Sequence, residues 1–201
     1  MNYLYLDLET TGLLKNNSII ELAASFYKEG KLVSSFYEKC NAGDQNIDLE
    51  ALKINKTKFK DLNSRCSEKE LIQKFCDWLL SLDIFNVELA GVNVHFDYNF
   101  LKNRAEQYNI VLGSVLPYRL YDISQDIRTA VKLGLLTIQK SGKGNSLLDA
   151  AKALKLEFEE KNLHSAKGDV DLYVKVHKEI EKIFKQAMCS CNKTNIKAAN
   201  E

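Results

Sequence analysis

The chain has 201 residues, of which 45% are hydrophobic and 27% charged, and its formal net charge is +1. This length allows one sizeable core, and the composition is ordinary for a globular protein. The near-zero net charge excludes recognition of nucleic acid or membrane by a global field, so any nucleic-acid surface must be a local patch.

No run of about 18 or more apolar residues occurs, and no basic stretch precedes Asp7 and Glu9. We therefore expect neither a transmembrane helix nor a signal peptide, and no membrane partner. Five scattered cysteines, an odd number, favour reduced thiols and a cytoplasmic location. Cys189 and Cys191 lack a second cysteine pair or nearby histidines, which disfavours a zinc site.

The first part of the chain predicts three strands, at residues 2–8, 19–27 and 31–37. Glu29-Gly30 is typical of a tight turn, so these strands should form an antiparallel meander. Ser67 and Glu70 form a capping box that opens a helix.

The rest of the chain predicts one buried strand at 87–94 and several helices. The helices are expected at about 98–107, about 122–133, from 146 onwards, and at about 169–187, with a loop at Ser141–Gly144. These elements indicate an α/β fold, a mixed sheet covered by helices. We predict one domain over residues 1–187 and a polar, flexible tail over 188–201.

Asp7 and Glu9 stand two residues apart in the apolar first strand, so they point to the same face. Two buried like charges are unfavourable unless something compensates them, and oxygen ligands suit Mg²⁺ or Mn²⁺. A strand end with two solvated acids is the alternative that this pattern alone leaves open.

Three further side chains have the residue types of a metal-dependent hydrolase. Asp97 follows the strand at 87–94, and Asp169 opens the last helix with His164 on the loop before it. Each acid could instead be a helix cap, and His164 could be a solvated loop residue. Together with Asp7 and Glu9, they suggest a divalent-metal centre for phosphodiester hydrolysis, with a neutral histidine accepting a proton from water.

Three motifs carry a resemblance to a known family. Asp7-Leu-Glu9-Thr-Thr-Gly-Leu13, Asn93-x-x-Phe96-Asp97 and His164-x-Ala-x-x-Asp169 resemble, in order, the motifs of the DEDDh family of 3′–5′ exonucleases. That family includes the proofreading epsilon subunit of bacterial DNA polymerase III. The resemblance implies a ribonuclease H-like mixed sheet of five strands, the first three antiparallel, with the fifth within residues 114–121.

The resemblance also implies roles for these residues. Asp7, Glu9 and Asp169 would hold the first of two Mg²⁺ or Mn²⁺ ions. Asp7 would bridge to the second ion, which Asp97 would support largely through water, and His164 would be the general base. The substrate-binding residues implied are Thr10, Thr11, Gly12, Leu13, Glu50 and Asn93. Asn55-Lys56 replaces a histidine-glycine pair of the epsilon-like proteins.

The leading hypothesis is a metal-dependent exonuclease that removes nucleoside monophosphates from the 3′ end of nucleic acid, with DNA favoured. The partner would be a single-stranded 3′ end of DNA or RNA, with a DNA polymerase as a further candidate. Two alternatives stay open. One is an exoribonuclease that trims RNA 3′ ends, and the other is a non-catalytic module that docks on a polymerase or on nucleic acid.

Overall fold

The computed structural model describes residues 1–42, 47–56, 66–139, 146–159 and 163–198, with side chains to residue 190. The chain forms two compact units. The first contains Met1–Asp122 and Glu159–Asp171, and the second contains Ile123–Phe158 and the chain from Leu172 onwards. A single domain over residues 1–187 stays a prediction. The loop expected at Ser141–Gly144 lies outside the described residues.

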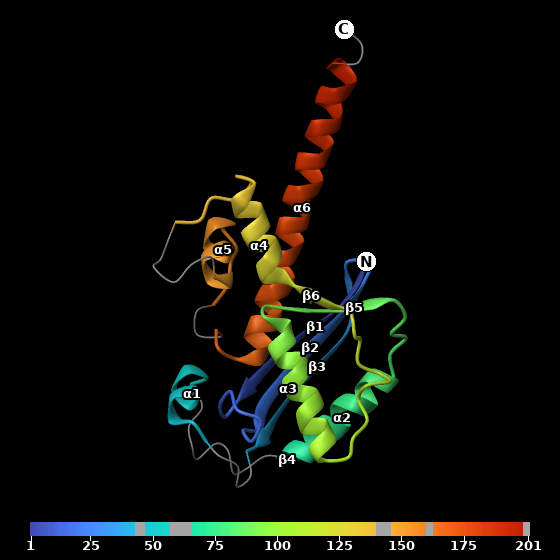
Figure 1. The fold of residues 1–201 in the computed structure, drawn as a ribbon, viewed down its shortest axis with the longest axis vertical. Coiled ribbons are helices and arrows are strands. Elements are labelled where there is room, and N and C mark those ends of the chain that lie inside the picture. Colours follow the sequence, from blue (N-terminus) through green and yellow to red (C-terminus); the bar gives the residue numbers. More distant parts are fainter. Residues whose placement is uncertain (43–46, 57–65, 140–145, 160–162, 199–201) are drawn as a thin grey trace. The chain divides into compact units, whose positions relative to one another are not determined.

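The first unit contains a mixed sheet with strand order β4-β3-β2-β1-β5-β6 (Figure 1). The strands are β1 (Asn2–Thr10), β2 (Ile19–Lys28), β3 (Lys31–Asn41), β4 (Cys66–Ser67), β5 (Val87–Gly91) and β6 (Leu120–Asp122). β1, β2 and β3 are antiparallel, as predicted, while β5 runs parallel to β1 and β6 parallel to β5. Glu29 and Gly30 both have positive φ, which matches the twist of a tight hairpin.

The described sheet has six strands where the sequence predicts five. The extra strand, β4, has two residues that pair with Cys40 and Asn41 at the end of β3. So short a pairing leaves no periodicity to read. β6 begins inside the predicted 114–121 stretch and ends one residue beyond it.

Two helices of the first unit cover one face of the sheet, α2 (Glu68–Leu80) and α3 (Val94–Gln107) (Figure 1). Leu4, Leu6 and Leu8 of β1 belong to the main core with residues of both helices. The capping box of Ser67 and Glu70 opens α2 as predicted. A third helix, α1 (Leu49–Ile54), follows an Asp48 cap.

α3 begins at Val94, about one turn before the predicted start. β5 ends at Gly91, and Asn93 turns the chain with a left-handed φ of 56°. A Cβ on Gly91 would lie 2.9 Å from the carbonyl oxygen of Leu6, so only glycine lets β5 pass this close to β1. This turn brings the first turn of α3 to the end of β1.

The second unit consists of α4 (Ile123–Lys132), α5 (Leu147–Ala153) and most of α6 (Ala166–Ala198). Leu172, Val176 and Ile180 are buried, as expected for the apolar stripe of α6. The helix extends beyond the predicted range of 169–187 at both ends, and no proline or glycine interrupts residues 188–198. Flexibility of residues 188–201 stays a prediction. Within the described ranges, no helix is both long and apolar enough to cross a membrane.

Candidate active site

Three carboxylates of the first unit meet on the face of the sheet opposite the leucines of β1. Asp7 and Glu9 come from β1, and Asp169 comes from the first turn of α6. One ligand oxygen from each lies within 4.8 Å of the others. Asp7 and Glu9 are buried and Asp169 is half-buried. The structure therefore brings together the three acids predicted to hold the first metal ion.

Asp97 lies in the first turn of α3 and does not cap that helix. Its Oδ1 accepts a hydrogen bond of 3.1 Å from the backbone N–H of Leu8, between Asp7 and Glu9. β5 pairs with β1 only as far as Tyr5, so the N–H of Leu8 finds its partner in this side chain. Asp97 is not in the three-acid group, but it is fixed to the same end of β1.

Burial and mutual repulsion raise the pKa of Glu9 from 4.5 to about 8. Burial is the largest cause, followed by the charges of Asp169, Glu21 and Asp97, and Lys39 acts in the opposite direction. A raised pKa means that the folded chain alone holds the negative charge poorly. A divalent cation would supply the missing compensation.

Asp97 and Asp169 also have raised pKa values, and burial is again the largest cause. Burial raises the pKa of Asp97 to about 8, although the hydrogen bond from Leu8 opposes it. Burial raises the pKa of Asp169 to about 6, opposed by the charge and backbone N–H of His164 and by the charge of Lys56. Clustered oxygen ligands with weakly held charges fit a divalent cation, so the predicted metal site is chemically consistent with this structure.

His164 is exposed and has a left-handed φ of 62°, two residues before α6 begins at Ala166. Its backbone N–H donates a hydrogen bond to the carboxylate of Asp169. The N–H of Asp169 in turn donates to the carbonyl of Ser165 at 2.9 Å. These bonds fix the loop beside the three acids and leave the imidazole open to solvent.

The loop after β1 is held by its own polar groups. Thr11 and Ser18 exchange two hydrogen bonds of 2.8 Å, and the Thr10 hydroxyl donates to the carbonyl of Gly12. Gly12 has a φ of 154°, and a Cβ there would lie 2.6 Å from the side chain of Asn17. Leu13 is 78% exposed. The predicted substrate loop is therefore rigid at its base, and it presents an apolar side chain to solvent.

The remaining predicted substrate residues come from different elements of the first unit. Asn93 is exposed, and its backbone N–H donates to Asp122 at 3.1 Å. Glu50 is exposed in the first turn of α1. Asn55, which replaces the family histidine, donates from its side chain to the carbonyl of Thr10 at 2.9 Å. α1 is thereby tied directly to the end of β1.

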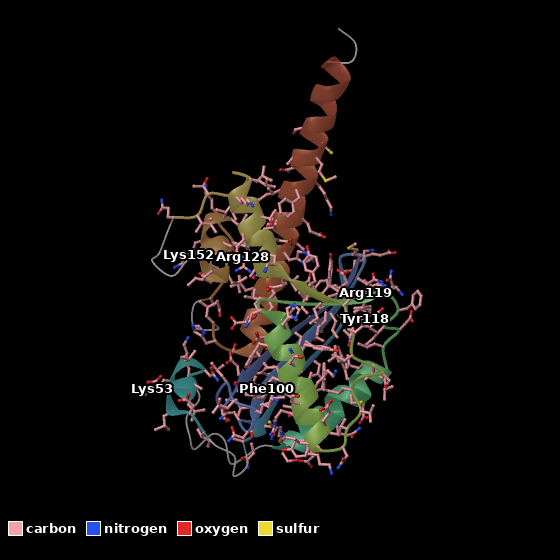
Figure 2. All side chains as sticks on the ribbon, in the orientation of Figure 1. Lys53, Phe100, Tyr118, Arg119, Arg128 and Lys152 are labelled. Carbon is pink, nitrogen blue, oxygen red and sulfur yellow. The ribbon has the colours of Figure 1, made fainter. Side chains whose placement is uncertain are left out.

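A cavity of about 250 Å³ lies beside Leu13 in the first unit. Its walls combine aromatic and polar side chains, among them His95, Phe96, Asn99 and Phe100. Figure 2 labels Phe100 on α3. Exposed polar groups around an aromatic surface suit a nucleobase, which stacks through its face and accepts hydrogen bonds at its edge.

Sequence reasoning missed Glu21, a buried carboxylate that lies opposite Glu9 in the β1–β2 register. Lys39 of β3 binds one of its oxygens at 3.0 Å, whereas Oε1 has no hydrogen-bond partner among the described residues. The signal was present in the sequence. Glu21 interrupts the apolar run Ile19–Tyr27 just as Asp7 and Glu9 interrupt the first strand.

The sheet order, the covering helices and the carboxylate cluster define a ribonuclease H-like α/β domain with a site suited to a divalent cation. The chain belongs to the exonuclease family RNase_T, whose sequence model matches residues 4–177. The predicted family is thereby confirmed.

A DNA polymerase III of the PolC type from Lacticaseibacillus paracasei is 29% identical over 203 aligned residues. The alignment covers 96% of this chain but 12% of the polymerase, so the chain spans only a small part of that relative.

Solved structures of Exonuclease I share the fold, which confirms the predicted fold class. The E. coli enzyme in complex with a dT13 oligonucleotide superposes with a TM-score of 0.78 at 15% identity, covering 94% of this chain and 43% of that one. A zinc-bound E. coli ExoI–ssDNA complex gives 0.75 at 16% identity, covering 98% and 45%.

Proposed function

We propose that this chain is a metal-dependent 3′–5′ exonuclease that hydrolyses phosphodiester bonds at the 3′ end of nucleic acid and releases nucleoside monophosphates. The observation that carries this proposal is the group of Asp7, Glu9 and Asp169, with ligand oxygens within 4.8 Å of one another in a chain of the exonuclease family.

Asp7, Glu9 and Asp169 would hold the first of two Mg²⁺ or Mn²⁺ ions, with Asp7 shared and Asp97 supporting the second. Such ions, when bound, lower the pKa of the attacking water and neutralise charge on the phosphate. The bond from Leu8 to Asp97 fixes this acid against β1, so its orientation does not depend on an exposed rotamer.

His164 is the proposed general base. Its exposed imidazole can be reached by the attacking water, and a neutral imidazole can accept a proton from that water. The hydrogen bond from its backbone to Asp169 couples the position of this loop to the acid cluster. The proposed base and the acid Asp169 are therefore linked by a backbone hydrogen bond.

Single-stranded DNA is the proposed substrate, because structures of the similar Exonuclease I contain single-stranded DNA or dT13. The loop Thr10–Leu13 and Asn93 would receive the terminal nucleotide, and its base would use the cavity beside Leu13. Glu50 would contact the same nucleotide from α1. The relationship to a PolC-type polymerase makes a DNA polymerase a candidate partner.

The test is product analysis. DNA and RNA oligomers of one sequence are incubated with Mg²⁺, Mn²⁺ or EDTA, and released mononucleotides are separated by chromatography. We expect metal-dependent release of nucleoside 5′-monophosphates, faster from DNA and lost in a folded Asp7→Ala variant. Faster release from RNA would favour the trimming exoribonuclease. No release from either strand would favour the non-catalytic docking module.

A further inference from the structure

Lys56 lies next to the candidate active site, at the turn that follows α1. Its backbone has a left-handed φ of 52°, and its side chain is exposed. The ammonium Nζ donates a hydrogen bond of 3.1 Å to the carbonyl of Leu163. Because Leu163 directly precedes His164, this bond places a positive charge beside the loop of the proposed base.

The charge of Lys56 also reaches the acid cluster. It is one of the groups that oppose the rise in the pKa of Asp169. The neighbouring Asn55 is bonded to the carbonyl of Thr10, at the end of the strand that carries Glu9. The two-residue turn Asn55–Lys56 is thus anchored to both sides of the site, with a cation near the acids.

A polyanionic strand that approaches several buried carboxylates meets repulsion. The chain has a net charge of only +1, so attraction must come from cations placed locally. A lysine ammonium on a flexible stem is suited to a phosphate, because it acts as a point charge with three donors.

We propose that Lys56 binds a backbone phosphate of the substrate strand at the entrance to the carboxylate site. This inference rests on the proposed exonuclease function and adds a binding residue that the three exonuclease motifs do not contain. Lys56 would contribute to capture of the strand, with the chemical step left to the acids and His164.

The test uses Lys56→Gly, because glycine adopts the positive φ at this position without steric cost. The charge is removed while the turn is kept, so the melting temperature should not fall. Lys56→Arg restores the charge. Lys53→Ala is the matched control, since Lys53 is an exposed lysine on α1 and is labelled in Figure 2.

We expect Lys56→Gly to raise KM for a single-stranded oligonucleotide by about 3- to 10-fold, the size of one typical net hydrogen bond at an exposed position, with kcat within about twofold. The slope of log KM against log salt should shrink by about 0.7, the value for one phosphate contact on a single strand. Lys56→Arg should return KM to near wild type, and Lys53→Ala should leave both quantities unchanged.

An unchanged KM and salt slope in Lys56→Gly would overturn the proposal. A fall in kcat alone would also overturn it, because Lys56 would then only support the loop of His164. Fluorescence anisotropy of a labelled oligonucleotide in Ca²⁺ measures strand binding by Lys56→Gly separately from hydrolysis. If the wild type binds the strand in Ca²⁺ but releases no mononucleotide in either Mg²⁺ or Mn²⁺, the proposed exonuclease function fails. Weaker binding by Lys56→Gly would then still support the phosphate contact, and equal binding would refute it.

Discussion

Replacing Glu9 with glutamine should stabilise the metal-free protein at neutral pH. The pKa of Glu9 is raised from 4.5 to about 8, chiefly by burial and then by neighbouring acids. Because the folded-state pKa is the higher one, the folded chain keeps a proton that the unfolded chain loses. The associated stability is fully present below about pH 4.5 and is lost as the pH rises through about 8. Glutamine does not ionise and so avoids this loss.

The size of the stabilisation by Glu9→Gln follows from the pKa shift of Glu9. At pH 7 the medium is 2.5 pH units above the unfolded pKa of 4.5, which gives an upper bound of about 3 kcal/mol. At pH 5 the same reasoning gives less than about 1 kcal/mol. Glu9 is 9% exposed, so solvent screens it only weakly. A gain of about 2 kcal/mol at pH 7 would raise the melting temperature by roughly 4–8 °C for a chain of this size.

The assay is thermal denaturation in EDTA at pH 5 and pH 7. Glu106→Gln, at an exposed position on α3, controls for loss of a carboxylate as such. Mn²⁺ should reverse the order at pH 7, because wild type binds it more tightly than Glu9→Gln. An equal or lower melting temperature for metal-free Glu9→Gln at pH 7, or the same difference at both pH values, would show that ionisation of buried Glu9 does not destabilise the folded chain.

The remaining predictions concern the base, the protons and the Glu21 pair. His164→Ala should lower turnover by roughly 10²–10⁴-fold while Mn²⁺ still stabilises the protein, and unchanged turnover would remove His164 from the mechanism. Mn²⁺ binding at pH 7 should release protons held by Glu9 and Asp97, because both carboxyl groups have a pKa of about 8 in the metal-free protein. Fewer protons should be released at pH 9, where both groups are mostly ionised before the metal binds. Calorimetry of Mn²⁺ binding in buffers of different ionisation enthalpy counts the released protons. Proton release that does not fall with pH would contradict these shifts. Lys39→Met should lower the free energy of unfolding in urea by about 1–3 kcal/mol, because Glu21 loses its 3.0 Å ion pair, whereas Lys39→Arg should retain stability. A Lys39→Met variant as stable as wild type would show that the pair contributes little.

Strand alternation and helix capping, which depend only on neighbouring residues, were predictable from the sequence. The alternation of β1 placed Asp7 and Glu9 on one face, and the capping box of Ser67 and Glu70 marked the start of α2. The family motifs predicted that Asp169 acts with these acids, and the structure places one ligand oxygen of each within 4.8 Å of the others. The individual roles of the site residues remain proposals.

Features that depend on distant contacts were not predictable in the same way. The start of α3 depends on the close approach of Gly91 to Leu6, which no periodicity reveals. The bond from Leu8 to Asp97 joins residues 89 apart in sequence. The anchoring of Asn55 and Lys56 to both sides of the site likewise requires the folded chain.

Glu21 could have been identified from the sequence, because a carboxylate within an apolar strand is also the pattern that identified Asp7. It is a carboxylate in an apolar strand, and its buried position opposite Glu9 follows once β1 and β2 pair in the observed register. Register was the missing information, since a one-residue slip would have moved Glu21 to the opposite face. The β1–β2 register, once known, identifies Glu21 as a neighbour of Glu9.

The most direct test of metal-dependent 3′–5′ exonuclease activity is a gel assay on a 5′-labelled single-stranded DNA oligomer. Wild type is compared with a folded Asp7→Ala variant in Mg²⁺, Mn²⁺ and EDTA, and a strand with a blocked 3′ end is run beside the free strand. We expect a ladder that shortens from the free 3′ end, requires metal and disappears in Asp7→Ala. An intact label-bearing strand in both metals, or equal shortening by Asp7→Ala, would contradict it.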